Sequence, residues 1–558
     1  MTTESTMLKQ FLFIAFFFLL HLGLRAQDLE TIGKEKPIRF NGGLALGANF
    51  YHVEGIEPRS KPFLWSINGS PTVTLFGISF PFYFNIGAQN RSFAQPFNQF
   101  GVSPKYKWLT LHAGWRSLNY SNYTLGGLVM LGGGFEMKPG IFRLSAIAGR
   151  LNKAVREDST QKNFGFPPSY KRMCYAGKIG IGNDRTFLDF IVLKAKDDSS
   201  SYTDAPSTLR PQENLVVGLN GKAMILKHVQ LGMDVAASAY TRDQKLDSIN
   251  DPLLNRFSFF KPNASSQLLF AGNVYIGYVS RFVNLKLNYR RVDQDFKSMG
   301  AFIFQTDVEA YTVEPSFNML KGKVRVSGSI GLQRDNLLRN KLVTTDRTIG
   351  SVNLSIQATK HYGFDIQYGN YGIAQRAGII PVNDTTRLAL ANQNFTLINR
   401  YTKADKSRSF GVIGLLMYQN LTSLNEFQKD LIGNTVMVGN LNFNYGLPTS
   451  GTSYSAGLNF SQTEFNQGLA RQFGPTLGVS LAFFKKKLNT SLGTGFMSNQ
   501  FAGDNSGLTI NSNINLNYRI TKGHSFISSL RVTHNTADTP VANPFTEFWM
   551  SAGYQFNF

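Results

Sequence analysis

The end of the chain, from Phe545 to Phe558, most strongly limits what this sequence can fold into. From Phe548 onward the even positions are apolar except for Ala552, which is small, and the odd positions are small or polar except for Trp549. Side chains of a β-strand point alternately to its two faces, so this segment predicts a strand with one apolar and one mostly polar face. The closing strand of a water-soluble sheet would show the same alternation, and from this segment alone that alternative stays open.

The same alternation recurs along most of the 558 residues. It is clear over 283–290, 324–333, 352–358 and 440–445, and clearest over 508–520. The mean hydropathy of −0.15 is too polar for a helical membrane protein. A transmembrane β-barrel fits this profile, because lipid-facing and lumen-facing residues alternate and cancel in any hydropathy average.

The aromatic positions Tyr554, Phe556 and Phe558 resemble the C-terminal insertion signal of bacterial outer-membrane β-barrels. This resemblance implies an all-β fold: a single large antiparallel transmembrane barrel that the barrel-assembly machinery inserts into the bacterial outer membrane. It also implies that the C-terminus lies in the periplasm.

Connections between the expected strands alternate in length, as short periplasmic turns and long external loops do in such barrels. Short turns are expected at 138–140, 183–185, 321–323, 485–487 and 521–523, and long loops at 156–170, 197–211, 243–264, 374–386 and 424–433. The alternation holds back to about residue 120. Between 54 and 120 the count is odd, so one element there is missed or invented, and an even number gives about 24 to 26 strands, with 26 preferred.

The N-terminal 26 residues read as a signal peptide. Lys9 precedes an apolar run from Phe11 to Leu20, and Ala26 offers a small residue at the cleavage edge. A short periplasmic segment, 27–36, and a barrel over 37–558 are then expected, with both termini periplasmic and no room for an N-terminal plug domain. The leader's end and three loop triplets resemble sequences of Bacteroidota, the triplets its O-glycosylation motif: Asp158-Ser159-Thr160, Asp247-Ser248-Ile249 and Asp384-Thr385-Thr386.

The formal net charge is +22, and the basic residues are dispersed rather than gathered on one helix. Outer-membrane lipid and lipopolysaccharide are therefore expected as partners instead of nucleic acid. Plainly solvated turns are the alternative. A periplasmic or lipoprotein partner subunit would also fit a wide barrel without its own plug.

Catalytic, metal and cofactor sites are not expected. The histidines are scattered without metal-ligand spacing, and Cys174 is alone, so it cannot form an internal disulfide. The one histidine that could serve a hydrolase is His112, because alternation places its side chain on the lumen face beside Thr110. A histidine with a structural role in the wall is the stronger interpretation.

The candidate lumen lining is hydrated and mildly cationic. It consists of Lys286, Arg290, Arg325, Asn511, Asn513, Asn515, Asn517 and Arg519. Barrels of 16 to 18 strands already leave an aqueous channel, so a wider one needs inward segments or a partner to close it. Two segments are expected to close the lumen. One is Arg91 to Lys105, with two prolines and three phenylalanines, for which a long external loop is the alternative. The other is the loop 243–264 with Phe257, Phe259 and Phe260.

These features predict a channel or translocation component occluded by inward loops or a partner subunit. A surface interaction or scaffold protein of an envelope complex, anchored by the barrel, is the alternative. Wall sequence does not separate the two, because a fold does not fix a function.

Overall fold

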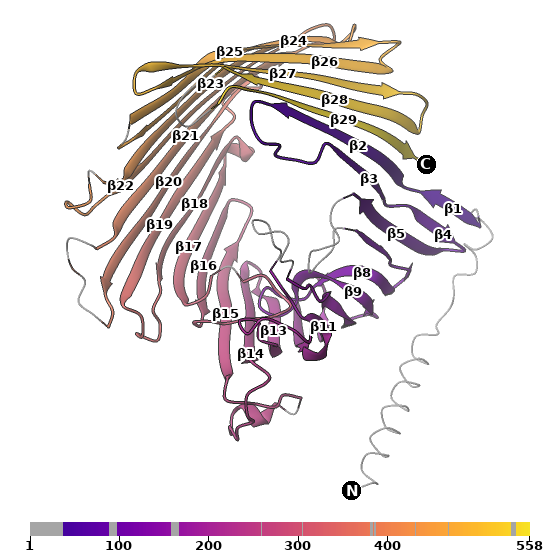
Figure 1. The fold of residues 1–558 in the computed structure, drawn as a ribbon, viewed down its shortest axis with the longest axis vertical. Helices are drawn as coiled ribbons and strands as arrows, with labels where there is room; N and C mark the ends of the chain where they lie inside the picture. Colours follow the sequence, from indigo (N-terminus) through magenta and orange to yellow (C-terminus); the bar gives the residue numbers. More distant parts are fainter. Residues whose placement is uncertain are drawn as a thin grey trace.

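The computed structural model describes residues 37–88, 98–157, 167–257, 259–303, 305–379, 383, 387–429, 431–466, 468–536 and 543–558. They form one antiparallel sheet that closes on itself (Figure 1). Closure is made by β2 (Gly43–Glu54) and β29 (Phe545–Asn557), which pair from Gly43 with Asn557 to Glu54 with Thr546. The predicted last strand is therefore the one that seals the barrel.

Each wall strand pairs with the strands before and after it in the chain. The remaining strands are β1 (Ile38–Asn41), β3 (Phe63–Gly69), β4 (Thr72–Leu75), β5 (Ile78–Gly87), β6 (Gln99–Val102), β7 (Lys105–Tyr106), β8 (Leu109–Asn119), β9 (Gly126–Met137), β10 (Phe142–Asn152), β11 (Lys171–Gly182), β12 (Phe187–Asp198), β13 (Glu213–Leu226), β14 (Val229–Thr241), β15 (Ser266–Val279), β16 (Val283–Val292), β17 (Val308–Met319), β18 (Val324–Arg334), β19 (Val343–Ile356), β20 (Tyr362–Ala377), β21 (Ala389–Ala404), β22 (Ser409–Ser423), β23 (Gly433–Leu447), β24 (Thr452–Phe465), β25 (Gly468–Phe483), β26 (Leu488–Phe501), β27 (Asp504–Arg519) and β28 (His524–Asn535). Three single-turn helices complete the described elements: η1 (Ser199–Ser201), η2 (Leu254–Arg256) and η3 (Leu320–Gly322).

Three wall strands are each built from two segments: β1 with β2, β3 with β4, and β6 with β7. In each case both segments pair with the same neighbouring wall strand. Over the described residues the 29 strand segments therefore make 26 wall strands, as the sequence predicts. Two of the breaks lie at Ser70-Pro71 and Ser103-Pro104, because proline has no N–H to give to the ladder.

The uncertain element between 54 and 120 is the wall strand β6–β7. The expectation that Arg91 to Lys105 forms a constriction is wrong for 98–105, which lies in the wall, and 91–97 lies outside the described residues. The chain turns at Lys107, whose φ is 48°, so Tyr106 ends one strand and Leu109 begins the next.

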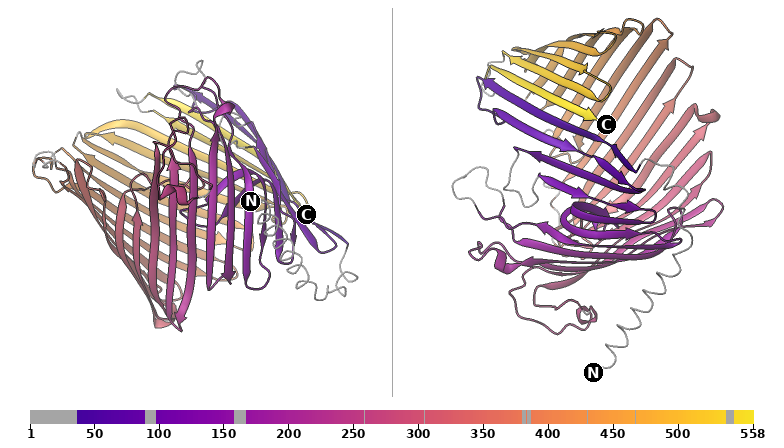
Figure 2. Two further views of the ribbon diagram at one scale, coloured as in Figure 1. Left: turned by 90° about the horizontal axis from the view of Figure 1, so that it is seen from below. Right: turned by 90° about the vertical axis from the view of Figure 1, so that its right-hand side faces the viewer.

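The two rims of the barrel differ. One carries the turns 76–77, 107–108, 138–141, 183–186, 227–228, 280–282, 320–323, 357–361, 405–408, 448–451, 484–487 and 520–523, and we call it the short-turn rim. The opposite, long-loop rim carries 153–170, 199–212, 242–265, 293–307, 378–388 and 424–432 among its connections. Figure 2 shows the strands running obliquely between the rims. The short turns and long loops expected from the sequence fall on opposite rims, but the long-loop rim also carries the two-residue turn 502–503. Ile38 and Phe558 both lie at the short-turn rim.

A row of four glycines crosses the wall and creases it. Gly101, Gly114, Gly132 and Gly149 are neighbours in register across β6, β8, β9 and β10. The backbones approach so closely that a Cβ built on Gly132 would lie 2.0 Å from the Ala148 carbonyl oxygen. Glycine is therefore required where the wall turns sharply, in the lower part of Figure 1.

Candidate functional site: the barrel lumen

The register from strand to strand identifies the side chains that share the lumen face. Asp189, Asn220, Asp234, Asn273 and Arg290 are successive neighbours across β12 to β16. The connection 120–125, which follows β8, contacts this row five strands away. A short connection can reach that far only across the concave side of the wall, so the row faces the lumen.

The connection 120–125 folds into the lumen and is held there by hydrogen bonds. The Asn220 side-chain amide donates to the Tyr120 carbonyl oxygen at 2.9 Å. The Asn122 amide donates to Asp234 Oδ2 at 3.0 Å. Tyr120 Oη lies 2.6 Å from Ser145 Oγ, and burial raises the pKa of Tyr120 to about 12, an increase that the Ser145 hydrogen bond opposes.

The connection 293–307 also folds inward and covers the first one. The Met299 amide donates to Asn214 Oδ1 at 2.9 Å, and Ser298 Oγ donates to the Thr124 carbonyl oxygen at 2.5 Å. Ser238 Oγ donates to the Lys297 carbonyl oxygen at 2.7 Å. Together these bonds fasten 293–307 to β13, to β14 and to the connection 120–125.

Lys297 carries the one ammonium group that 293–307 brings inward. Its Nζ donates to Gln212 Oε1 at 3.1 Å and to Tyr240 Oη at 3.3 Å, and it lies 5.2 Å from the centre of the Tyr240 ring. Burial lowers the pKa of Lys297, and the nearby charge of Arg172 lowers it further. The charged form of Lys297 is therefore less stable in the packed segment than it would be in water.

An apolar core forms where the two inward connections meet the wall. Leu193 and Val216 of the lumen face are 0% exposed because these connections cover them. The buried residues of this core are Leu118, Tyr120, Tyr123, Leu125, Leu128, Met130, Ile147, Leu151, Cys174, Ala176, Ile191, Leu193, Ala195, Val216, Ala236, Tyr240, Ala271, Val292, Phe296, Met299 and Val308. One arc of the lumen, from β8 to β17, is therefore filled by the chain itself. We call it the filled arc.

Two aspartates fasten the ends of 293–307 at the long-loop rim. The Asp307 amide donates to the Asp293 carbonyl oxygen at 3.2 Å, so the ends lie side by side. The Asp307 carboxylate accepts the amides of Asn336 and Leu337, each at 2.9 Å, and is paired with Lys341. Burial alone would raise the pKa of Asp307, but these hydrogen bonds and the lysine charge outweigh it and hold the pKa below its ordinary value.

A polar network lies on the lumen face beside this core. Asp189 accepts both Arg143 Nε at 2.8 Å and Arg143 Nη2 at 3.1 Å, and Lys178 Nζ lies 3.6 Å from its second oxygen. Lys178 also stands 5.0 Å from the centre of the Tyr120 ring. Ion pairs of the wall thus support the inward connection 120–125.

His112 lies on the lumen face, as alternation predicts, between a serine and a glutamate. Ser103 Oγ is 2.8 Å from His112 Nδ1, and His112 Nε2 is 3.1 Å from Glu136 Oε1. Acyl transfer needs N–H donors for an oxyanion as well. The Ser103 amide already donates to the Pro81 carbonyl oxygen at 3.0 Å, and the next residue, Pro104, has no N–H. We therefore interpret the three residues as a bridge between wall strands.

The eight candidate lumen residues all share the face of Asp189 and Asn220, because the register keeps one parity around the ring. The shared parity can be followed through every strand pairing from β16 to β29 and back to β2. Two of the cations are engaged: Lys286 pairs with Glu314 at 3.3 Å, and Arg290 donates to the Gln305 carbonyl oxygen at 3.4 Å. Asn511, Asn513, Asn515, Asn517 and Arg519 stand on β27, and Arg325 on β18, outside the filled arc.

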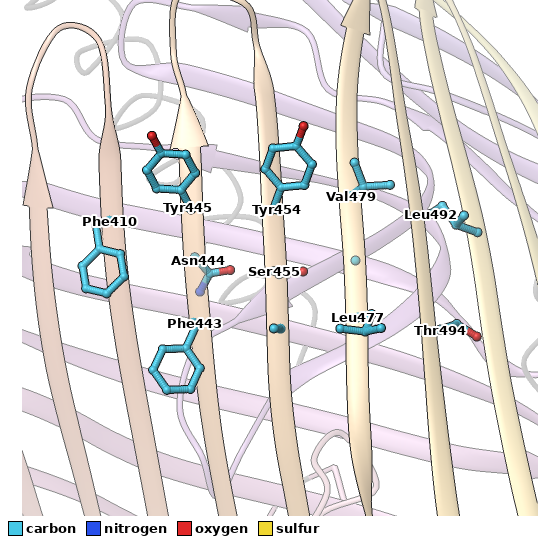
Figure 3. A pocket seen from close by; sticks show the side chains of 12 residues that line it. Phe410, Phe443, Asn444, Tyr445, Tyr454, Ser455, Leu477, Val479, Leu492 and Thr494 are labelled. Atoms are coloured by element: carbon cyan, nitrogen blue, oxygen red, sulfur yellow. The ribbon is translucent and has the colours of Figure 1, made fainter.

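The outward face is apolar and aromatic. Figure 3 shows Phe443, Tyr445 and Tyr454 pointing away from the lumen, whereas Asn444 points through the wall to the other side. A groove of about 450 Å³ lies between these rings and Leu477, Val479 and Leu492. An apolar outer band with interfacial aromatics is the surface that a barrel presents to lipid.

The loop 242–265, expected among the inward segments, lies on the outward face instead. Leu254 and Phe260 pack against Leu215 and Ala239, which share the outward parity of their strands. The expectation that Phe257, Phe259 and Phe260 occlude the lumen is therefore wrong. Burying aromatics needs apolar surface, and the outer wall offers more of it than the polar lumen does.

The sequence reasoning missed the segment that does fold inward. The stretch 293–307 contains Phe296, Met299 and Phe302 between two aspartates, without alternation. Aromatic residues in a segment without alternation were the one sequence sign that this connection folds inward. Phe257, Phe259 and Phe260 show the same sign, yet they belong to a loop on the outward face. Only the register distinguishes the two.

Within the described ranges, no group of three or more His, Cys, Asp and Glu side chains is placed to hold a metal ion. Cys174 is buried in the filled arc. Among the residues described, no helix is long and apolar enough to cross a membrane.

No protein-family model and no curated protein matches this chain. Among solved structures, it is similar to the FrpB iron transporter from Neisseria meningitidis, with 12% identity, a TM-score of 0.38, and coverage of 96% of this chain and 83% of that one. It is also similar to the copper transporter OprC, with 10% identity, a TM-score of 0.41, and coverage of 94% and 82%. OpdQ of Pseudomonas aeruginosa matches with 11% identity, a TM-score of 0.35, and coverage of 64% and 97%. At this level of similarity, the activities of those proteins cannot be transferred to this chain.

Proposed function

We propose that this chain is a channel or translocation component of the bacterial outer membrane, narrowed by its own connections 120–125 and 293–307. The observation that carries the proposal is the asymmetry of the lumen. The filled arc holds a core of fully buried side chains, whereas the candidate arginines and asparagines on β18 and β27 are exposed on the remaining arc. A wide ring of this kind leaves an aqueous path beside a fixed constriction.

In this proposal the apolar outer band lies in the membrane, and the short-turn rim with both termini lies in the periplasm. Tyr554, Phe556 and Phe558 stand at that rim: Tyr554 and Phe556 continue the outward parity of β29, and the Phe556 and Phe558 ring centres are 5.1 Å apart. They would present the insertion signal to the barrel-assembly machinery. Lipid and lipopolysaccharide would surround the band, and a periplasmic or lipoprotein partner would meet the short-turn rim.

The test is conductance through the full chain in planar bilayers, compared with a variant that lacks residues 294–306. Because Asp293 and Asp307 are hydrogen-bonded, a two-glycine bridge can join them without moving the wall. We expect the intact protein to conduct and the variant to conduct severalfold more. Unchanged conductance after removal would contradict a constriction by this segment.

The matched control removes residues 245–262 from the outward loop. Its ends are also close, since Ser265 Oγ donates to the Asp243 carbonyl oxygen at 3.2 Å. Because this loop lies outside the wall, its removal should leave conductance unchanged. If this control variant conducted as much more than the intact protein as the first variant does, the higher conductance would reflect a general loosening of the barrel.

A barrel-anchored interaction protein is the second candidate, favoured by the same outward loop. Phe259 is 76% exposed, and Leu253 and Leu246 of the same loop are exposed as well. Exposed apolar side chains, where they gather into a patch, mark contact surfaces for protein or membrane. No conductance by either the intact chain or the variant without 294–306 would favour this candidate.

A further inference from the structure

The twelve turns of the short-turn rim carry a large excess of positive charge. Ten of them contain lysine or arginine, and the twelve together hold fourteen of these residues against two carboxylates, Asp184 and Asp405. In one turn, Lys485, Lys486 and Lys487 follow one another directly. We call the fourteen lysines and arginines of these turns the basic ring, because they recur around the whole circumference.

Among the described residues, the long-loop rim has no comparable excess. Its connections also include fourteen described lysines and arginines, but eleven aspartates and glutamates accompany them. Several of those carboxylates pair with a neighbouring cation, as Asp243 does with Arg210 at 3.0 Å. In the basic ring, the described residues form one ion pair, between Lys138 and Asp184 at 3.6 Å. The charge of the short-turn rim is therefore largely uncompensated within the described chain.

The same turns expose large apolar side chains beside the basic ones. Leu320 is 70% exposed and Phe484 is 71% exposed, and each is followed directly by a lysine of the basic ring. Six of the twelve turns combine an exposed apolar side chain with a basic one in this way. Such a pair suits the edge of a membrane, where the apolar side chain enters the lipid and the ammonium group reaches the headgroups.

Outward tyrosines place these turns at the edge of the apolar band. Tyr445 and Tyr454 point away from the lumen, each three residues from a short turn (Figure 3). Tyr362 and Tyr401, which are register partners on β20 and β21, share this face and lie within four residues of a short turn. Tyrosine is enriched at membrane–water interfaces, so the basic ring, just beyond these tyrosines, stands at the level of the lipid phosphates.

We propose that the basic ring binds the phosphate groups of anionic phospholipids in the leaflet beside the short-turn rim. A lysine ammonium is a compact charge with three N–H donors, and basic residues at a membrane surface are attracted to anionic headgroups. The inference rests on the proposed function, which places this rim at the periplasmic face. It deepens that function by naming the lipid class that surrounds the rim.

A folded anionic protein fits the arrangement less well than a leaflet does. A protein docked on the rim would contact some turns and not others, whereas basic residues occur in ten of the twelve. A leaflet surrounds every turn equally, and it accepts the apolar side chains of the turns as well as their charges. Lipopolysaccharide would lie beside the long-loop rim in the proposed orientation.

The test compares spin-labelled phosphatidylglycerol with spin-labelled phosphatidylcholine in phosphatidylcholine vesicles that contain the full chain. Electron spin resonance gives the fraction of each label held at the protein surface. We expect phosphatidylglycerol to associate roughly threefold more strongly, because its headgroup is attracted to the basic ring. About 1 M sodium chloride should weaken this preference, because salt screens the attraction. Both leaflets have the same composition, so the result does not depend on the direction of insertion.

The variant of the basic ring is Lys321→Glu, Lys323→Glu, Lys485→Glu, Lys487→Glu, which removes eight of the twelve net positive charges of the turns. Lys486 is left in place because its Nζ donates to the Pro448 carbonyl oxygen at 2.7 Å. The preference for phosphatidylglycerol should fall to less than roughly 1.5-fold, since it depends on the charge of the ring.

The matched control makes the same change of charge on the long-loop rim, at four exposed lysines: Lys61→Glu, Lys245→Glu, Lys261→Glu, Lys429→Glu. It should keep the preference of the unaltered chain. Heat-modifiable migration verifies that both variants are folded barrels. Equal association of the two lipids with the unaltered chain, an undiminished preference in the ring variant, or an equal loss in the control would overturn the proposal. Lipid association is measured without conduction, so this result and the conductance result for the proposed function fail or stand separately.

Discussion

The amide of Met299 donates a 2.9 Å hydrogen bond to the side-chain oxygen of Asn214, a residue of the wall that is fully buried. The same asparagine donates to Ser238 Oγ at 2.7 Å and to the Ala239 carbonyl oxygen at 3.2 Å. One carboxamide therefore ties the inward connection 293–307 to two adjacent strands.

Replacing Asn214 by leucine should loosen 293–307 without opening the wall. The Met299 N–H would be left buried and unpaired, at a cost of about 1–3 kcal/mol. Hydrogen–deuterium exchange over 293–303 should speed up accordingly, while exchange in β27 stays unchanged. Asn515→Ala, which removes a hydrogen bond to Ser491 on the open arc, serves as the control and should leave exchange in 293–303 as it was.

The glycine crease should reject a methyl group on one face only. Gly132→Ala places its Cβ against the Ala148 carbonyl oxygen, whereas at Gly133 the nearest atom, the His112 carbonyl oxygen, would be 3.4 Å away. We expect Gly132→Ala to destabilise the barrel by about 1–3 kcal/mol and Gly133→Ala to change stability little. Urea midpoints of heat-modifiable migration measure both. Equal effects would mean that the crease is not a close contact.

Deleting Tyr554 to Phe558 should abolish assembly of the barrel. The deletion removes the end of the β2–β29 seam, including the paired hydrogen bonds between Gly42 and Phe558, each 3.0 Å, and the outward aromatics of the expected insertion signal. Heat-modifiable, membrane-embedded protein should disappear. Normal amounts of it would contradict both the seam and the signal.

Cysteine labelling tests the orientation of the rims. A cysteine at Ser248, exposed in the outward loop, should react with an impermeant reagent on whole cells, and one at Lys486 on the short-turn rim should not. Native Cys174 is fully buried and gives no background. Thr385, an equivalent external position by sequence, lies outside the described residues. The reverse labelling would invert the topology.

Acid should release the connection 335–342 from Asp307. The folded pKa of this carboxyl is depressed, by hydrogen bonds from Lys341, Leu337 and Asn336 that outweigh burial. Its contribution to stability is therefore complete above the unfolded value of about 3.9 and is lost as the pH falls through the folded pKa. Exchange protection of 335–342, corrected for intrinsic rates, should hold from pH 7 to about pH 4 and decline below it. Asp307→Asn should remove that decline.

The wall was predictable from the sequence because it is local. Alternation over 508–520 and the turns at 485–487 and 521–523 depend only on neighbouring residues. Requiring an even number then leaves about 24 to 26 strands, and the preferred number, 26, is the one found. The strand β6–β7 was hidden because Pro104 and the positive φ of Lys107 break its pattern within a few residues.

The contents of the lumen were not predictable in the same way. Phe296 and Phe260 both lie in aromatic loops, yet one packs inside the wall and the other outside. That choice depends on which face of strands far away in the chain each loop meets. Met417 shows the converse: the outward Leu416 and Tyr418 on either side of it conceal its inward position in a run with no alternation.

The crease at Gly101, Gly114, Gly132 and Gly149 also bears on how much space a barrel encloses. A closed loop of fixed perimeter has its greatest area when it is circular, and every sharp corner reduces that area without shortening the perimeter. Strand number sets the perimeter, whereas the crease sets the cross-section. In this molecule the four glycines therefore reduce the cross-section of the lumen without any change in the number of strands.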